Sequence, residues 1–303
     1  MAEISKLSGV AIADVAKVDA VTKANIANIN DLTIPSGVVT PILDTYTNAS
    51  VAFGVRLLLT GYTGACMEVR RDSDNTTQDI GFDSNGDLDT SALATFVGTG
   101  NNGFVRTWYG QESSGGTGSG NDAEQTTNAN QPKIYDSTTG LITQNGKPAL
   151  QYDGSNTSLS VTLASALSQP STHSHVGFTN SGGTGQFLTD GTPNRSIVNT
   201  ADAVGNVALF AGSIISGGDV RNAQNHYFAL FNTTTSSIYV NNTLEASGNI
   251  GTGTHGATIT IGASNNLAQK LAGNIQEFII WNSNESSERA GIHTNVETFY
   301  SIP

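Results

Sequence analysis

The carboxylates are the residues of this sequence that could carry out chemistry, because two carboxyl groups about 5 Å apart can hydrolyse a glycosidic bond. The chain has 25 Asp and Glu residues, but no glutamate lies between Asp153 and Glu245. The acids of that stretch are Asp190, Asp202 and Asp219. Glu277 lies in a strand of alternating pattern, which predicts a solvent-facing side chain. This stretch is therefore poor in candidate acids, and the sequence predicts no catalytic residue.

One group of side-chain oxygens has the spacing of a calcium loop. Asp83, Asn85, Asp87 and Asp89 stand on alternate residues, as the first four ligands of such a loop do. The glycine at the sixth position and the glutamate at the twelfth are missing. A turn followed by a helix cap accounts for the same residues, and we prefer that interpretation. We expect no bound metal and no cofactor.

Two other pairs of polar residues have simple explanations. Arg70-Arg71 beside Asp72 and Asp74 could recognise an anionic sugar, but intramolecular bridges at a strand end explain the pattern better. His173 and His175 share one face of a strand, and no third ligand is apparent near them. We therefore expect both histidines to be surface polar residues.

A candidate contact surface for a carbohydrate or a host lies around the stretch 111–131, which is rich in Gly, Ser, Asn and Thr and predicts a long surface loop. Sugar binding generally requires a flat ring with amide or carboxylate partners. Trp108, Tyr109 and Trp281 could provide the ring, but each falls in an apolar strand, so core packing accounts for them equally well. The candidate residues are Trp108, Tyr109, Gln111, Asn121 and Asp122.

Composition and charge narrow the class of protein. Charged residues make up 13% of the chain, glycine occurs 34 times, and Ser, Thr and Asn dominate the polar stretches, which is typical of strands and turns. The net charge of −12 disfavours nucleic-acid binding. The single cysteine, Cys66, predicts a buried apolar residue. The sequence predicts no secretory signal and no membrane insertion.

The first 36 residues contain three repeats of 11 residues, beginning at Ile4, Val15 and Ile26. Three short repeats cannot bury their own apolar face, so this segment must pack on a partner. The period also suits a helical bundle, but β-branched positions and turn residues favour short extended segments. The anchor positions are Ile4, Leu7, Val10, Val15, Val18, Val21, Ile26, Ile29 and Leu32.

From Val38 onward, short apolar or alternating runs bounded by Gly, Asn, Asp or Ser predict many strands. Two segments interrupt this pattern and predict short helices, at 89–97 with Asp89 or Thr90 as the cap and at 286–299. Many strands with few helices predict an all-β sandwich or barrel.

The stretch 57–153 resembles the front half of the arabinofuranosidase catalytic-domain family, a set of concanavalin-like sandwiches also found in phage virion proteins. The similarity rests on Leu58-Leu-Thr-Gly-Tyr-Thr-Gly, Val69-Arg-Arg-Asp-Ser-Asp-Asn, Asp79-Ile-Gly-Phe-Asp, Thr107-Trp-Tyr, Gly120-Asn-Asp-Ala and Gln131-Pro. It implies a concanavalin-like jelly-roll β-sandwich over 38–303, with an arabinofuranosidase-like front half at 41–153 and a repetitive N-terminal anchor at 1–37.

The back half, 154–303, is similar to laminin-G-like modules through Ser237-Ile-Tyr-Val-Asn-Asn, Thr260-Ile-Gly-Ala and Leu271-Ala-Gly-Asn-Ile-Gln-Glu-Phe-Ile-Ile-Trp-Asn. Where the related enzymes carry an acid after the Ile-Gly strand, this chain has Ser264-Asn265-Asn266. The enzymes' Trp-Tyr-Asp-Gln becomes Trp108-Tyr109-Gly110-Gln111. These departures imply a protein without the family's hydrolase activity.

The N-terminal repeat resembles the leading segments of marine phage structural proteins. Together the resemblances imply a non-catalytic virion protein, a tail or head fibre or a capsid decoration, assembled in the host cytoplasm. They also imply a homotrimer that docks on other virion proteins through its N-terminus and presents a lectin-like sandwich to a host surface glycan or a neighbouring subunit. The alternative is a glycoside hydrolase of arabinofuranosidase type.

Overall fold

A computed structural model describes residues 39–180, 186–192, 197–201 and 206–302, together with six two-residue strands in the first 33 residues. The chain divides into two compact units, Met1–Thr40 and Pro41–Pro303. Among the described residues, no helix is long and apolar enough to cross a membrane.

The six strands of the first unit form three antiparallel hairpins that follow the 11-residue period. Each pair brings two anchor positions into register, Leu7 with Val10, Val18 with Val21 and Ile29 with Leu32. The strands are β1 Lys6–Leu7, β2 Val10–Ala11, β3 Lys17–Val18, β4 Val21–Thr22, β5 Asn28–Ile29 and β6 Leu32–Thr33. The extended interpretation of these residues is confirmed, while Ile4, Val15 and Ile26 lie outside the described residues.

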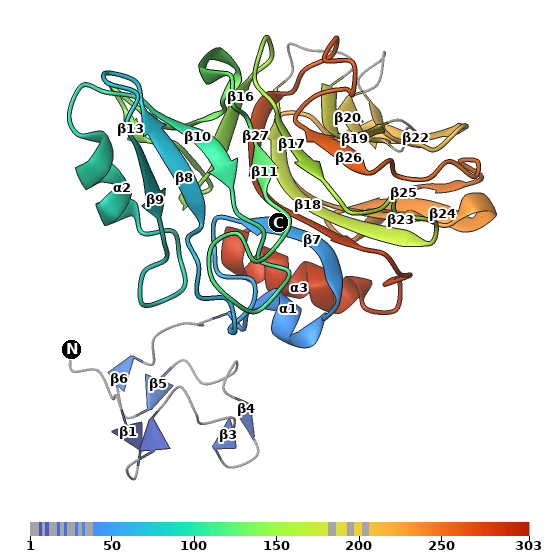
Figure 1. Cartoon of the computed structure of the whole chain (residues 1–303). Helices are drawn as coiled ribbons and strands as arrows, with labels where there is room; N and C mark the ends of the chain where they lie inside the picture. Colours follow the sequence, from blue (N-terminus) through green and yellow to red (C-terminus); the bar gives the residue numbers. More distant parts are fainter. Residues whose placement is uncertain are drawn as a thin grey trace. The chain divides into compact units, whose positions relative to one another are not determined.

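The second unit is built on one continuous antiparallel sheet of 19 described strands, which folds back on itself as a sandwich (Figure 1). The strands of its front half are β7 Ala49–Gly54, β8 Met67–Arg71, β9 Thr77–Ile80, β10 Gly103–Trp108, β11 Ala123–Glu124, β12 Lys133–Asp136, β13 Gly140–Leu141 and β16 Leu150–Asp153. A separate hairpin pairs β14 Thr143–Gln144 with β15 Lys147–Pro148.

The strands of the back half continue the same sheet. They are β17 Leu159–Thr162, β18 Ser171–Thr179, β19 Gln186–Thr192, β20 Ile197–Ala201, β21 Asn206–Phe210, β22 Ile214–Asp219, β23 Gln224–Phe231, β24 Ser236–Val240, β25 Thr243–Gly248, β26 Thr258–Ile261 and β27 Ala272–Trp281. The expected all-β concanavalin-like sandwich is therefore confirmed.

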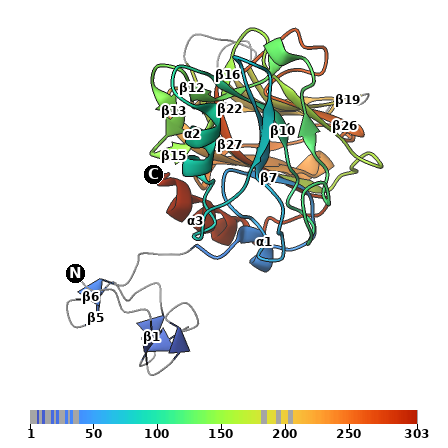
Figure 2. The same ribbon diagram turned by 60° about the vertical axis from the view of Figure 1, so that its left-hand side comes forward.

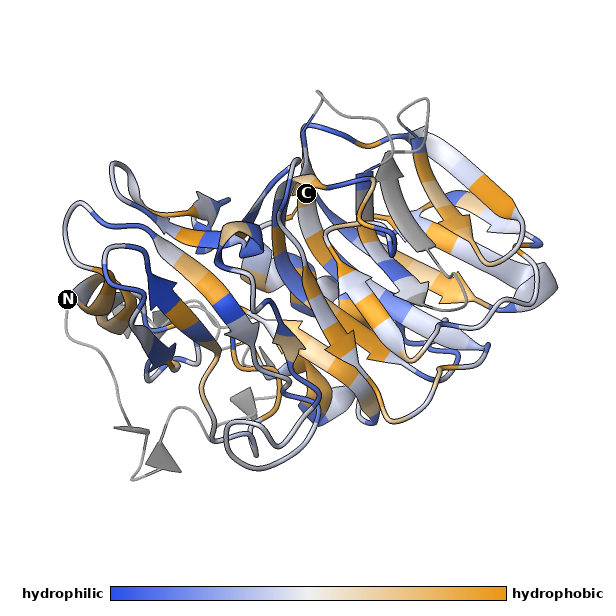
Figure 3. Cartoon of the chain, turned by 45° about the horizontal axis from the view of Figure 1, so that its top comes forward, coloured by the Kyte–Doolittle hydropathy of each residue, from blue (hydrophilic) through white to orange (hydrophobic). Residues whose placement is uncertain are grey.

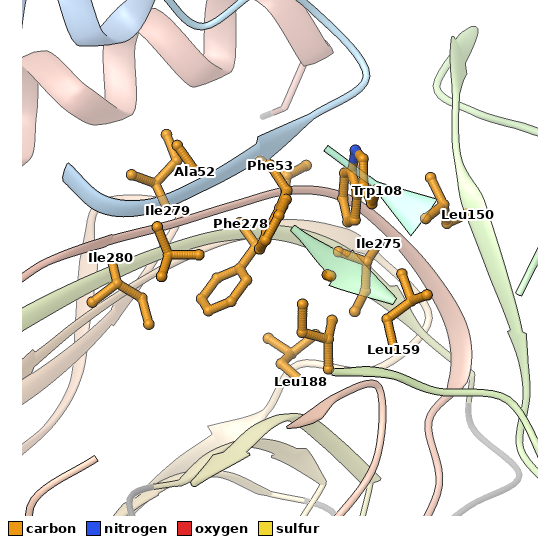
Figure 4. Close-up of a cluster of buried hydrophobic side chains, with 14 of the residues drawn as sticks. Ala52, Phe53, Trp108, Leu150, Leu159, Leu188, Ile275, Phe278, Ile279 and Ile280 are labelled. Atoms are coloured by element: carbon orange, nitrogen blue, oxygen red, sulfur yellow. The ribbon is translucent and has the colours of Figure 1, made fainter. Parts of the chain in front are cut away.

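Strand β27 joins the two halves, since it pairs with β7 and β16 of the front half and with β18 of the back half. The core is packed around it, and Figure 4 shows Phe53, Trp108 and Phe278 side by side. The Phe53 ring centroid lies 5.5 Å from that of Trp108 and 6.2 Å from that of Phe278. Figure 3 shows apolar and polar residues alternating along many of the strands.

Three helices accompany the sheet, and α1 and α3 lie close together beside β7 while α2 lies near β13 (Figures 1 and 2). Helix α2, Thr90–Val97, begins at the predicted cap, because the Asp89 side chain accepts a hydrogen bond from the Ala92 amide. Helix α3, Arg289–Tyr300, confirms the second predicted helix. The one-turn α1, Ile42–Thr45, carried no capping signal in the sequence.

Helix α3 covers the face of β18, β23 and β27 that points away from the sandwich interior. Beneath it, the Arg56 guanidinium makes two hydrogen bonds to the Glu277 carboxylate, at 2.7 and 3.1 Å. The Tyr300 hydroxyl donates to the same carboxylate at 3.0 Å. Both faces of these central strands are thus buried, and one of them carries an ion pair.

Candidate functional site

Tyrosine and carboxylate side chains gather where β8, β9 and β10 end near the loop 111–122. Tyr109 follows β10 directly, and its hydroxyl donates a hydrogen bond of 2.8 Å to Asp79 Oδ1 on β9. Tyr62 lies nearby with its ring edge-on to Phe82, and its hydroxyl donates to the Ala65 carbonyl at 2.7 Å. We call Tyr62, Asp79, Tyr109, Glu112 and Asp122 the Tyr109 cluster.

The two carboxylates of the loop are held by backbone amides. Asp122 Oδ1 accepts from the Gly110 amide at 3.0 Å, and Glu112 Oε1 accepts from the Asn121 amide. A Cβ added at Gly110 would lie 2.5 Å from the Asn121 carbonyl oxygen. Gly110 is therefore required by the close approach of two backbone segments.

Burial dominates the electrostatics of the Tyr109 cluster. It raises the pKa of Glu112, and the neighbouring Asp122 adds to the increase. Burial also raises the pKa of Asp122, to which Glu124 contributes further. Glu112 Oε2 is buried and has no hydrogen-bond partner among the described residues. Burial without a partner favours the protonated form of such a carboxyl group.

The structure brings together only part of the sequence-predicted contact set. Tyr109, Asn121 and Asp122 are partly exposed beside the loop. Trp108 and Gln111 are fully buried, so neither can face a ligand. Trp108 Nε1 donates to the Gly54 carbonyl at 3.3 Å, and the Gln111 amide bonds the backbone of Gly54, Arg56 and Leu58.

Asp79, Glu112 and Tyr62 are the members of the cluster that sequence reasoning missed. The Tyr109–Asp79 contact spans 30 residues of sequence, and no spacing rule connects the two. The one usable signal was that 79–83 and 107–109 both lie in the arabinofuranosidase-like motifs.

The candidate calcium residues form the turn and cap that we preferred. Asp83 Oδ1 accepts from the amides of Asn85 and Asp87, at 2.8 and 3.0 Å. Asp87 forms an ion pair of 2.9 Å with Lys147, and Asp89 caps α2. The carboxylates are therefore engaged in local structure.

The charged pair on β8 is also intramolecular, as expected. Arg71 forms an ion pair of 2.6 Å with Asp74. Arg70 instead donates to Gln131 and Asn75, and its guanidinium stacks 5.0 Å from the Phe104 ring centroid.

Three surface predictions were wrong. His173 and His175 are 0% exposed, because both face the interior between the two layers. Glu277 is likewise 0% exposed, because α3 covers its face of β27 and Arg56 neutralises it. Strand alternation assigns a side chain to a face but does not reveal whether that face is covered.

Two of the three acids between Asp153 and Glu245 lie among the described residues, and each is bonded to a different partner. Asp190 is fully buried, and its Oδ2 accepts from the Asn265 amide at 2.9 Å. Asp219 is paired with Arg221 at 2.6 Å on the surface. Asp202 lies outside the described residues. Ser264 is buried, and its hydroxyl donates to Asn266 Oδ1 at 2.7 Å.

The architecture of this chain is similar to that of several solved structures. No protein-family model matches the sequence, and no curated protein matches it. Among solved structures, an arabinofuranosidase complexed with arabinofuranosyl-α-1,2-xylobiose superposes with a TM-score of 0.66 at 15% identity. The match covers 86% of this chain and 65% of that one. The fold of the sandwich is therefore similar to that of the arabinofuranosidase.

A second match is a glutamine variant of a glycoside hydrolase family 54 α-L-arabinofuranosidase soaked with 4-nitrophenyl α-L-arabinofuranoside. It has a TM-score of 0.64, 16% identity and the same shares of both chains. The enzyme soaked with a cyclic sulfate inhibitor gives a TM-score of 0.60. This chain thus spans 65% of the length of these enzymes, and at such identity the likeness concerns the fold alone.

Proposed function

We propose that this protein is a non-catalytic member of the arabinofuranosidase-type sandwiches, a virion structural protein that docks through its N-terminal repeat and presents the sandwich for contact. The observation that carries the proposal is the state of Ser264. The resemblance implies a catalytic acid at this position, and a serine hydroxyl does not act as a general acid at neutral pH. The buried hydroxyl here bonds Asn266, and it also accepts from the Gln269 amide at 3.0 Å.

The docking role is supported by the 11-residue repeat. Isolated two-stranded hairpins are at best marginally stable in water, so three of them require a partner surface. Leaving their Val, Ile and Leu side chains in water would cost about 1.5–3 kcal/mol each. A homotrimer of this chain together with other virion proteins would supply the missing cover.

The test is an incorporation assay with the full chain and its variants. Deleting 1–36 should leave a folded sandwich that no longer co-sediments with particles. Val18→Asp and Ile29→Asp should do the same, because each puts an unpaired charge into the contact. Lys17→Asp is the matched control, since it introduces the same residue at the neighbouring position of the same strand, outside the apolar positions of the repeat. Normal incorporation of the deletion variant would show that the sandwich itself carries the docking surface.

The contact role is assigned to the Tyr109 cluster and its loop. A partly exposed tyrosine with carboxylate partners suits a neutral hydroxylated ligand, such as a host surface glycan. A glycan array with the full chain tests this, with Tyr109→Phe as the matched variant, because it keeps the ring and removes only the hydroxyl bonded to Asp79. Equal signals on all glycans would show that the sandwich does not recognise a glycan and acts as a scaffold alone.

A second candidate function, a glycoside hydrolase of arabinofuranosidase type, is favoured by one observation. Glu112 and Asp122 are neighbouring carboxyls, and the pKa of each is raised by burial. Raised acids of this kind are typical of active sites. Release of arabinose from an aryl arabinoside, abolished in Glu112→Gln and Asp122→Asn, would establish this activity and overturn the non-catalytic proposal.

A further inference from the structure

All five histidines of the chain are buried, and none exceeds 6% exposure. They lie on both faces of the β18–β23–β27 sheet. His226 and His293 face each other beneath α3, with their Nδ1 atoms 2.9 Å apart. The other three, His173, His175 and His255, lie in the sandwich interior, and we call them the interior histidine cluster.

The rings of the interior histidine cluster contact one another and two phenylalanines. The His173 centroid lies 4.5 Å from His255, edge-on, and 5.9 Å from His175. Phe231 lies 4.6 Å from His173, and Phe278 stacks on His175 at 4.5 Å. Imidazoles thus occupy positions where a sandwich core normally holds aliphatic side chains.

None of the six ring nitrogens of this cluster has a hydrogen-bond partner among the described residues, although all are buried. A neutral imidazole has one N–H donor and one acceptor nitrogen, and burying them unpaired is unfavourable. Within the described part of the chain, no three His, Cys, Asp or Glu side chains are arranged to hold a metal ion.

The cluster also lies at a backbone junction. His255 and Leu167 exchange two backbone hydrogen bonds, of 2.9 and 3.1 Å, which join the connection before β26 to the connection before β18. The Gln169 side chain adds bonds to the Gly251 and Gly253 carbonyls. Displacement of the His255 ring would therefore disturb the backbone hydrogen bonds between His255 and Leu167.

We propose that the interior histidine cluster is an acid-sensitive element, which keeps the 163–170 and 249–257 connections joined at neutral pH and separates them when it is protonated. Separation of the two connections hydrates the imidazoles and exposes Phe231 and Phe278. The protein would thereby present new apolar surface in an acidic environment.

In the part of the chain that the structure describes, the groups that face the cluster offer no counter-charge to a proton. On its own face, β23 contributes Tyr227, the register partner of His175, whose hydroxyl is bonded to Asn225. On the opposite face lie His226 and the Glu277 carboxylate, and the latter is already bonded to Arg56 and Tyr300. Each proton added to the cluster would therefore repel the next.

The direction of the pH effect follows from burial. Burial lowers the pKa of His175 and His255 to about 3, and it lowers that of His173 well below the ordinary 6.5. The unfolded or opened chain therefore binds more protons than the folded one between these values, so stability is present above about pH 6.5 and is lost as the pH falls. Below about pH 6.5, each imidazole lowers the folding equilibrium constant by up to about tenfold for each unit by which the pH falls. Three imidazoles together lower it by up to about a thousandfold.

The test measures proton uptake on unfolding of the full chain between about pH 5.5 and 6.5, where ordinary carboxylates contribute little. Urea titrations at several pH values, followed by tryptophan fluorescence, give this number from the slope of stability against pH. We expect about two to three protons from the cluster, in addition to those taken up by His226 and His293, whose pKa values burial also lowers. His255→Leu and His175→Leu should each remove about one, whereas His293→Gln, outside the cluster, should leave the cluster's contribution in place.

Hydrogen–deuterium exchange of the wild-type protein gives the second measurement and does not depend on a variant folding. Amides of 163–170 and 249–257 should exchange at least tenfold faster at about pH 5.5 than at pH 7.5, after correction for the intrinsic rate, while β10 and β27 remain protected. Proton uptake that is the same in His255→Leu and His175→Leu as in the wild type, or exchange in these connections that does not change with pH, would overturn the proposal.

Discussion

Removing one partner of the buried Arg56–Glu277 pair should destabilise the sandwich severely. The side chains are only 3% and 0% exposed, and Tyr300 completes the network. Burial raises the pKa of Tyr300, so its hydroxyl keeps the proton that it donates to Glu277. In Arg56→Met, the Glu277 carboxylate would be left buried without its cation, which costs about 3–5 kcal/mol. In a chain of this size that corresponds to a fall in Tm of roughly 10 °C.

The assay is urea unfolding at pH 7, combined with a double-mutant cycle. Glu277→Leu alone should destabilise the protein by a similar amount, because it leaves the Arg56 guanidinium buried without its carboxylate. Nη1 of this guanidinium already lacks a partner among the described residues. The double variant should be less destabilised than the sum of the two by more than about 2 kcal/mol. Arg106→Met is the matched control, since its pair with Glu68 is 44% exposed on the arginine side and is worth about 0–1 kcal/mol.

The reasoning fails on either of two results. A loss below about 1 kcal/mol in Arg56→Met would show that water or a rearranged chain solvates Glu277 as well as the guanidinium does. Strict additivity in the cycle would show that the pair does not act as a unit, whatever its geometry.

Three further changes have defined outcomes. Asp89→Ala should cost about 0.5–2 kcal/mol through the lost cap of α2, measured by thermal unfolding, whereas Asp83→Ala should leave the α2 cap in place. Gly262→Ala should destabilise by more than about 1 kcal/mol, because its φ is +77° and a Cβ would lie 2.2 Å from the Tyr152 ring. Glu112→Gln should raise stability at pH 7 and lose this advantage near pH 4, because burial raises the pKa of Glu112 and the folded state favours the protonated form.

The local features of the fold were predictable from the sequence because their causes are local. Short alternating runs predicted β10, β17 and β27, and an acidic residue before an apolar window predicted the start of α2. The β-branched positions and turn residues of the N-terminal repeat predicted short extended segments, but not that these segments pair as hairpins.

What could not be predicted depends on contacts between distant segments. Arg56 and Glu277 are separated by 221 residues, and no pattern in either neighbourhood marks the other. The burial of His173 and Glu277 on opposite faces of adjacent strands requires knowing that one face meets a second layer and the other meets α3. For the same reason, the sequence placed Trp108 in a contact surface and missed Asp79 and Glu112.

The central position of β27 also has a consequence for synthesis of the chain. Its partners β7 and β16 belong to the front half, yet β27 is the last strand of the sheet to be made. At about 5–20 residues per second, the roughly 120 residues between β16 and β27 take on the order of ten seconds to emerge from the ribosome. During that interval the front half has open strand edges, which can pair with other chains. Yield should therefore depend on elongation speed and chaperone supply more than on the final stability of the sandwich.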